Sequence, residues 1–233
     1  MQRHNLSVVC MKLIIFIHTC EAYENSRAKL LENTWANNND IVFITDNKNS
    51  QLKNHFYIGP YKPGPTYHPE NIKKMFSLFL NRYCDYDFFM IIDDDSYLYV
   101  EKLKCFLSFF DKEQPYMIGD FLNWTHIHND HKFGGNYEYW IGGGPGIVFT
   151  KSCINQYVEL FNTHNIDDYN HDTWLHMLFK LSNGSIKRTH CPGFHQYGEN
   201  YLYIKYSKDD NNLISIHLNH NMNLLSKYHH TDF

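Results

Sequence analysis

Three consecutive aspartates carry the clearest chemical signal in the chain. Asp93, Asp94 and Asp95 directly follow an all-apolar run at 88–92. Carboxylates this close repel one another, and a divalent cation removes that cost. Mg²⁺ and Mn²⁺ accept carboxylate ligands and also bridge phosphates. The pattern therefore indicates a metal site for a phosphate-linked ligand such as a nucleotide diphosphate, with a solvated acidic turn as the alternative.

A glycine-rich segment is the second candidate. Residues 141–147 read Ile-Gly-Gly-Gly-Pro-Gly-Ile, which is too glycine-dense for the interior of a helix or strand and lacks the Lys-Ser/Thr of a P-loop. Gly143 and Gly144 would let the backbone approach a ligand closely, and Trp140 could stack on a sugar ring. A tight turn beside core aromatics is the alternative interpretation.

Two further residues are candidates for proton transfer and metal binding. Asp172 opens a predicted helix at 172–181, where the helix dipole stabilises a carboxylate, so it is either a base or a helix cap. His195 follows a Cys-Pro-Gly turn, and a neutral imidazole could complete a carboxylate metal site. In a chain with 16 histidines, a surface or hydrogen-bonded role is the competing interpretation.

The elements that must position these residues follow from hydrophobic periodicity. We expect strands at 12–18, 41–44, 88–92 and 117–119, and helices at 26–35, 69–83, 101–110, 151–161 and 172–181. Asn25 or Ser26 is the expected cap of the first helix. The opening β-α-β order favours a parallel sheet, whose ligand crevice lies outside the carboxyl ends of its strands.

Length and composition limit the classes of protein. With 233 residues, 43% of them hydrophobic, we expect a tail at 1–11 and a single domain at 12–233, of which the part after 209 is partly loose. Lys+Arg number 21 against Asp+Glu 25, which argues against a nucleic-acid binder. Six cysteines without a CxxC pair argue against structural zinc. The apolar stretch at 6–17 is too short to span a membrane, so we expect a soluble protein.

Taken in order, these motifs resemble the Fringe-like β-1,3-glycosyltransferases, the family that includes Fringe and the core-1 β-1,3-galactosyltransferases. The resemblance covers about residues 12–200. It rests on the following residues: Thr19; Arg27, Leu30, Leu31, Thr34 and Trp35, similar to Arg-x-x-x-Leu-x-x-Thr-Trp; Ile44, Thr45 and Asp46; Asp93, Asp94, Asp95, Ser96 and Tyr97; Gly119; Gly143, Gly144, Pro145 and Gly146; Phe194 and His195.

The resemblance implies a GT-A glycosyltransferase fold, an α/β fold with a Rossmann-like, mostly parallel central sheet flanked by helices. It also implies Mn²⁺ or Mg²⁺ and a nucleotide-sugar donor, usually a UDP-sugar. The metal ligands carried over are Asp95, His195 and Asp93. The residues carried over to the donor site are Thr19, Arg27, Asp46, Lys74, Asp93, Asp94, Trp140, Gly143 and Gly144.

The implied reaction is an inverting transfer of a sugar to a hydroxyl of a glycan or glycoprotein acceptor, expected to form a β-1,3 linkage. Asp172 is the expected base, with Asp167 and Asp168 as alternatives. His171 stands where the family has the first acid of an acidic pair, and His176 stands where it has glycine.

Two other classes of function stay open. One is a catalytically inactive carbohydrate-binding or interaction protein on the same fold. The other is a metal-dependent phosphoryl-transfer enzyme or nuclease, which the lack of excess positive charge disfavours. For the compartment, we expect the cytoplasm of a microbial or viral system, or the Golgi and secretory lumen if an anchor is missing from the chain.

Overall fold

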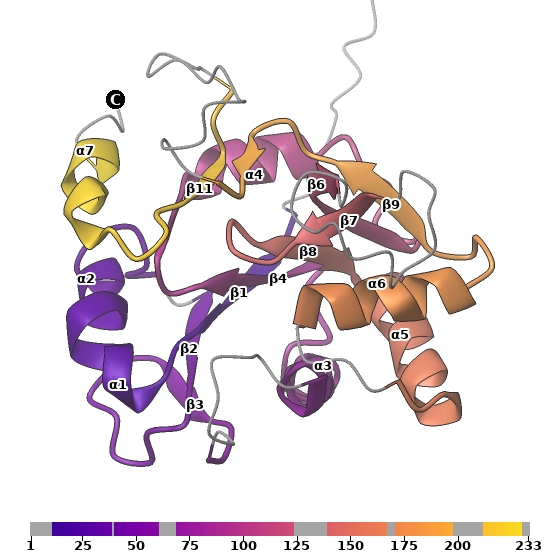
Figure 1. Ribbon diagram of the computed structural model, residues 1–233, viewed down its shortest axis with the longest axis horizontal. Coiled ribbons are helices and arrows are strands. Elements are labelled where there is room, and N and C mark those ends of the chain that lie inside the picture. Colours follow the sequence, from indigo (N-terminus) through magenta and orange to yellow (C-terminus); the bar gives the residue numbers. More distant parts are fainter. Residues whose placement is uncertain are drawn as a thin grey trace, which may run out of the picture.

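The computed structural model describes residues 11–38, 40–60, 69–123, 139–166, 171–197 and 212–229. A central eight-stranded sheet runs across the molecule with helices on both of its faces (Figure 1). Its strand order is β3-β2-β1-β4-β8-β6-β7, and β9 pairs with β6. The expected parallel-rich α/β architecture is therefore confirmed. Of the expected tail at 1–11, residues 1–10 lie outside the described residues.

The amino-terminal half of the sheet is parallel. It contains β1 (Leu13–His18), β2 (Ile41–Thr45), β3 (His55–Tyr57) and β4 (Phe88–Asp93). β1, β2 and β4 are buried throughout, which explains why their sequences are continuous apolar runs. Parallel pairing brings the carboxyl ends of these strands to one edge, so that His18 of β1 lies beside Asp93 of β4.

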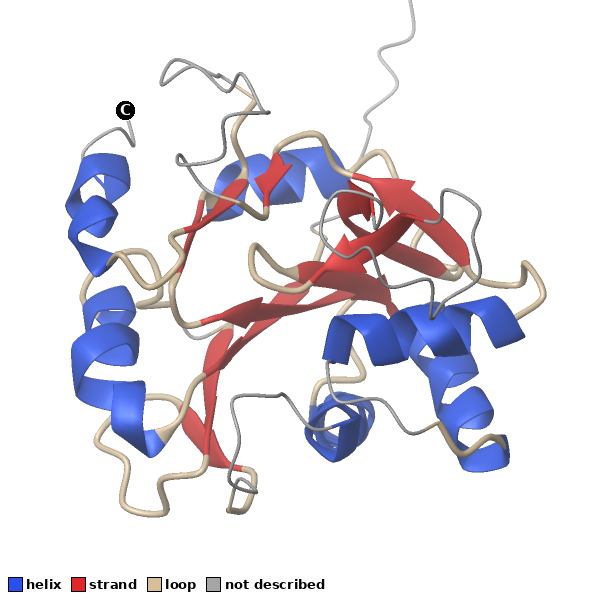
Figure 2. Ribbon diagram, in the orientation of Figure 1, coloured by secondary structure: helices blue, strands red, loops and turns tan. Residues whose placement is uncertain are grey.

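Helices cover both faces of this sheet (Figure 2). One core contains Leu13, Ile15 and Ile17 of β1 and packs against α2 (Lys29–Glu32), α4 (Val100–Leu107) and α7 (Leu225–His229). The other contains Ile14 and Phe16 and packs against α3 (Pro69–Arg82), α5 (Lys151–Thr163) and α6 (His171–Leu181). The alternation along β1 thus builds two cores, one on each face.

The other half of the sheet is largely antiparallel. β8 (Ile147–Thr150) pairs antiparallel with β4 and with β6 (Tyr116–Asn123), which also pairs with β7 (Tyr139–Gly142) and runs parallel to β9 (Lys187–His190). The glycine-rich segment therefore consists of two strand ends and a turn at 143–146. Gly146 has a φ of 105°, a left-handed conformation that favours glycine.

The first helical segment begins earlier than expected. It comprises α1 (Glu21–Tyr23), a π-helical stretch (Glu24–Ala28) and α2, so the expected caps Asn25 and Ser26 lie inside it. Its first N–H, on Glu21, donates to Asp46 Oδ1 at 2.7 Å. The acceptor thus comes from the end of β2, which no local capping pattern could reveal.

A smaller sheet joins the carboxyl-terminal part of the chain to the strand that follows the aspartates. It consists of β10 (Phe194–His195), β11 (Ser215–His217) and β5 (Ser96–Leu98), and a 3₁₀ turn (Met222–Leu224) leads from it into α7. β11 pairs antiparallel with β5, and His217 lies opposite Ser96. Residues 212–229, in the part of the chain expected to be partly loose, thus form a strand, a turn and a helix.

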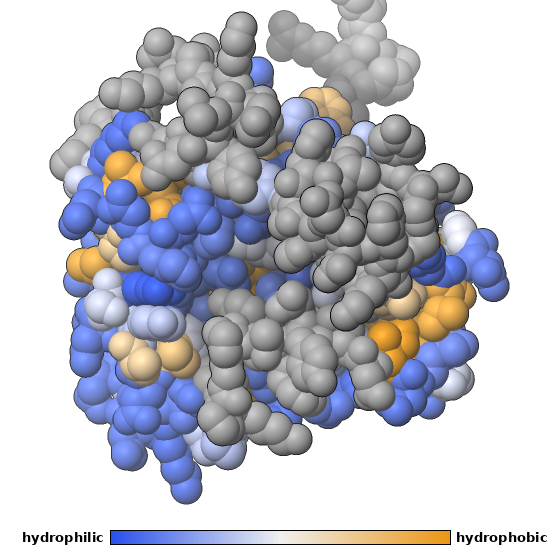
Figure 3. Space-filling view, in the orientation of Figure 1, coloured by the Kyte–Doolittle hydropathy of each residue, from blue (hydrophilic) through white to orange (hydrophobic). Residues whose placement is uncertain are grey.

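Hydrophilic side chains predominate over α1 and α2, at the left of the face shown in Figure 3, with small hydrophobic patches among them. The large apolar side chains exposed among the described residues come from separate elements: Tyr23, Leu30, Tyr57, Phe109, Tyr139 and Leu181. Within the described part of the chain, no helix combines the length and the apolar character needed to cross a membrane.

Candidate active site

The three aspartates form the end of β4 and the turn into β5. Asp93 is the last residue of β4, and Asp94 and Asp95 connect it to Ser96 at the start of β5. Their relative exposures are only 8%, 3% and 2%. The alternative of a solvated acidic turn is therefore wrong, and these buried carboxylates require partners.

Two polar side chains from the first β-α unit hold Asp94. Thr19 Oγ1 donates to Asp94 Oδ2 at 2.7 Å, and Arg27 Nη1 lies 3.1 Å from Asp94 Oδ1. Burial raises the pKa of Asp94 to about 6, although the hydrogen bond from Thr19 and the charge of Arg27 oppose the shift. The predicted site residues Thr19, Arg27 and Asp94 thus lie together.

Asp95 is surrounded by cationic or hydrogen-donating groups. His217 Nε2 lies 3.1 Å from Asp95 Oδ1, and Arg27 Nη1 lies 3.4 Å from Oδ2. His220 Nδ1 lies 2.7 Å from the same Oδ2. Burial alone would raise the pKa of Asp95, but His217, Arg27 and His220 outweigh it and lower the pKa to about 2. Asp95 is therefore held as a carboxylate.

Asp93, Asp95 and His217 form a group that suits a divalent cation. Each offers one ligand atom, and these atoms lie within 4.8 Å of one another. Two carboxylates supply the hard oxygen ligands that Mg²⁺ and Mn²⁺ prefer, and an imidazole is a common third ligand for first-row metals. The donor set therefore fits the cation implied by the sequence.

The histidine of this group is His217 and not the expected His195. His195 is buried in β10 beside Ile216 of β11, and it is not a member of the group with Asp93 and Asp95. His217 reaches the aspartates because β11 pairs with β5, the strand that begins directly after Asp95. Sequence reasoning missed it because this long-range pairing leaves no local motif; the alternating Ile-Ser-Ile-His at 214–217 was the only available signal.

The turn at 143–146, called the glycine turn below, packs directly against Asp93, Asp94 and Asp95, called the acidic turn. The carbonyl oxygen of Gly144 accepts from the N–H of Asp93 at 3.4 Å and from Ser96 Oγ at 2.7 Å. A Cβ atom at Gly144 would lie 2.6 Å from the ring of His217, and one at Gly143 would lie 2.0 Å from His171 Nε2. Glycine is therefore required at both positions, because each backbone lies against a histidine ring.

Asp172 lies in the first turn of α6, next to Trp140 of β7. Trp140 Nε1 donates to Asp172 Oδ2 at 3.3 Å, and the N–H of Thr173 donates to Asp172 Oδ1 at 2.9 Å. His171, the residue before Asp172, lies against Gly143 of the turn at 143–146. That turn also contacts the segment of the three aspartates. The alternative bases Asp167 and Asp168 lie outside the described residues.

Two buried histidines, His18 and His171, were not singled out as ligands or bases from the sequence. Burial lowers the pKa of His18 well below its usual value, and the nearby His171 lowers it further. Burial also lowers the pKa of His171, against the charge of Asp172. Both rings are therefore neutral near pH 7 and can donate and accept hydrogen bonds. The pair forms because the fold brings the end of β1 close to the start of α6, which no local sequence pattern indicates.

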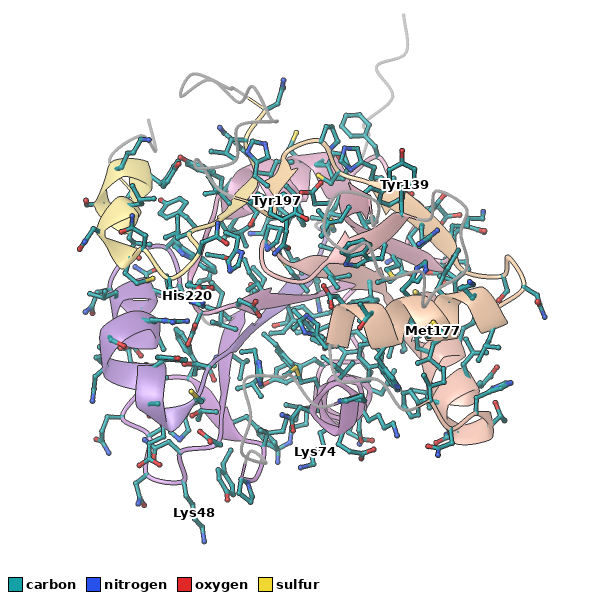
Figure 4. All side chains as sticks on the ribbon, viewed as in Figure 1. Lys48, Lys74, Tyr139, Met177, Tyr197 and His220 are labelled. Atoms are coloured by element: carbon teal, nitrogen blue, oxygen red, sulfur yellow. The ribbon has the colours of Figure 1, made fainter. Side chains whose placement is uncertain are left out.

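Asp46 and Lys74, both expected near the donor, have structural contacts. Asp46 accepts from the N–H of Glu21, as described above. Lys74 Nζ donates to the carbonyl oxygen of Ile58 at 3.0 Å. Figure 4 shows Lys74 on α3, well apart from His220, which contacts Asp95. A phosphate contact for Lys74 stays a prediction.

Comparisons with known proteins agree with the resemblance seen in the sequence. Human and mouse β-1,3-glucosyltransferases are each 25% identical to the chain, over 85% and 82% of its length. The chain spans only 40% and 38% of the length of those relatives. A glycosyltransferase involved in glycosylating the major capsid of PBCV-1 is 15% identical, covering 88% of this chain and 94% of that one with a TM-score of 0.46. A family model described as Fringe-like matches residues 9–232, so the chain belongs to the Fringe-like family.

Proposed function

We propose that the chain is an inverting, divalent-metal-dependent glycosyltransferase. It would move a sugar from a nucleotide-sugar donor, a UDP-sugar, to a hydroxyl of a glycan or glycoprotein acceptor and form a β-1,3 linkage. The observation that carries the proposal is the group of Asp93, Asp95 and His217 beside the glycine turn. The names of the human and mouse relatives favour glucose as the sugar to test first.

In this proposal Asp93, Asp95 and His217 hold Mn²⁺ or Mg²⁺. When bound, such an ion supplies positive charge for the diphosphate and for the charge that grows on it as it leaves. Thr19 and Arg27 fix Asp94 and so hold the acidic turn in one conformation. Arg27 also stacks on Tyr23, with its guanidinium carbon 3.7 Å from the ring centroid, which keeps its charge beside the carboxylates.

Asp172 is the proposed general base. It takes the proton of the acceptor hydroxyl while the hydroxyl oxygen forms a bond to the anomeric carbon of the donor. The bond between that carbon and the diphosphate oxygen breaks at the opposite face, so the configuration inverts. The hydrogen bond from Trp140 Nε1 orients the carboxylate. The remaining oxygen lone pairs are available for the acceptor, as a base requires.

The glycine turn supports both halves of this arrangement. Gly144 contacts the acidic turn and approaches His217, whereas Gly143 approaches His171, which precedes the proposed base. A rigid turn between the cation ligands and the base would hold donor and acceptor at attack distance, a large source of rate enhancement.

The proposal is tested by measuring UDP release from UDP-glucose, UDP-galactose and UDP-GlcNAc, with Mn²⁺ and with EDTA. We expect metal-dependent release with at least one donor. In Asp95→Asn, Mn²⁺ affinity falls by more than about a hundredfold, because even outer-shell changes cost 10- to 100-fold. UDP binding without transfer or hydrolysis of any donor would instead support the inactive binding protein. Equal release after EDTA treatment would exclude the metal role.

A further inference from the structure

The turn that follows β11 adopts an unusual backbone conformation directly beside Asp95. Asn219 and His220 have φ angles of 49° and 67°, so two consecutive non-glycine residues are left-handed. Each such residue costs free energy, which surrounding contacts must offset. Asn219 Nδ2 donates to the carbonyl oxygen of Tyr197 at 3.0 Å, and two further contacts of this turn run to Asp95. The N–H of Leu218 donates to the carbonyl oxygen of Asp95 at 2.7 Å, and the N–H of His220 donates to Asp95 Oδ2 at 3.0 Å.

The side chain of His220 adds a third contact to the same aspartate. Its Nδ1 lies 2.7 Å from Asp95 Oδ2, although the His220 side chain is 72% exposed. Figure 4 labels His220 between α7 and the amino-terminal helices, at the carboxyl edge of the parallel strands. An exposed ring turned back onto a buried carboxylate indicates that this contact, and not packing, sets its position.

The two carboxylate oxygens of Asp95 consequently have different surroundings. Oδ2 receives the N–H and the Nδ1 of His220 and also faces Arg27 Nη1 at 3.4 Å. Oδ1 faces His217 Nε2, another member of the proposed cation site, at 3.1 Å. A carboxylate oxygen has about two lone-pair sites, which His220 and Arg27 occupy on Oδ2. The neighbour of Oδ1 is His217, which is itself a proposed ligand of the cation.

We propose that His220 is a positioning residue that binds Oδ2 of Asp95 and so restricts this carboxylate to monodentate coordination through Oδ1. The inference rests on the proposed metal-dependent function. Monodentate ligation suits the compact, octahedral coordination of Mg²⁺ and Mn²⁺. Ca²⁺ is larger and accepts bidentate carboxylates and higher coordination numbers. His220 thereby makes the site selective for the smaller ions without touching them.

The test compares Mn²⁺ and Ca²⁺ affinities of the whole chain by titration calorimetry with each metal salt alone. His220→Gly removes the imidazole, keeps the N–H and suits the left-handed backbone. We expect it to weaken Mn²⁺ binding about tenfold, the lower end for an outer-shell residue, and to weaken Ca²⁺ binding much less. His220→Asn tolerates this backbone and restores a side-chain donor, so it should recover most of the Mn²⁺ preference.

Asn219→Gly is the matched control, because it relieves the neighbouring left-handed residue and leaves the His220 ring in place. It should keep the wild-type ratio of the two affinities. An unchanged ratio of Mn²⁺ to Ca²⁺ affinity in His220→Gly would overturn the role of His220, whether both affinities stay at wild-type values or fall equally. A wild-type chain that binds neither ion would instead overturn the proposed metal site itself, so the two failures are distinguishable.

Discussion

The acidic turn and the start of α6 both present carboxylates to the proposed site, but they hold them differently. Asp95 is 2% exposed and lies among His217, His220 and Arg27. Asp172 accepts one side-chain hydrogen bond among the described residues, from Trp140 Nε1 at 3.3 Å. The first carboxylate is therefore fixed by many donors, and the second is only oriented.

This difference matches two kinds of chemistry. A cation ligand works best when its geometry is set by neighbouring groups before the ion arrives. A general base needs a free lone pair within reach of the proton that it removes. The contrast predicts that substitutions in the acidic turn act on ion affinity, whereas substitutions at the start of α6 act on turnover.

The largest expected effect is on turnover in Asp172→Asn. An amide cannot accept the acceptor's proton, so transfer should fall about 10³-fold while Mn²⁺ and UDP affinities stay within about threefold. Transfer rates and titration calorimetry measure the two quantities. Asp111→Asn, an exposed aspartate in the segment after α4, should keep wild-type turnover. Unchanged turnover in Asp172→Asn, or an equal loss of ion affinity, would remove the contrast between the two regions.

Another buried carboxylate, Asp120 of β6, extends the comparison through its response to pH. It accepts from the N–H of Gln196 at 2.9 Å, and burial raises its pKa to about 7. The unfolded value is about 3.9, so the native state binds the extra proton between about pH 4 and pH 7. Stability due to this group is therefore present below that window and is lost as the pH rises through about 7.

Asp120→Asn should remove this loss. Relative to wild type, its free energy of unfolding should rise by about 2 to 4 kcal/mol between pH 4.5 and pH 8, since each pKa unit is about 1.4 kcal/mol. Urea denaturation at both pH values measures the difference. Parallel pH profiles for the two proteins would mean that Asp120 is already ionised across this range.

A smaller effect is expected at the turn that joins the two regions. The added Cβ in Gly143→Ala would lie 2.0 Å from His171 Nε2, so His171 must move, at a cost of about 1 to 3 kcal/mol in unfolding free energy. A double-mutant cycle with His171→Ala should recover most of that cost by removing the clashing ring. Additive losses of unfolding free energy in the cycle would show that a group other than His171 moves to accommodate the added Cβ.

Local patterns predicted most of the elements. The strands expected at 12–18, 41–44 and 88–92 and the helices expected at 69–83, 151–161 and 172–181 match β1, β2, β4, α3, α5 and α6 within a few residues. Continuous apolar runs and three- to four-residue spacing encode them directly. The start of the first helical segment was missed, because its acceptor, Asp46, is 25 residues from Glu21.

The sequence by itself determined the order of the motifs, and with it the family, the parallel start of the sheet and the place of Asp93, Asp94 and Asp95 at its carboxyl edge. The tertiary structure decided which side chains meet there. His217 and His220 reach Asp95 because β11 pairs with β5 across more than a hundred residues of chain. Periodicity records which face a residue occupies, but not which distant strand lies beside it, and that pairing selects His217 over His195.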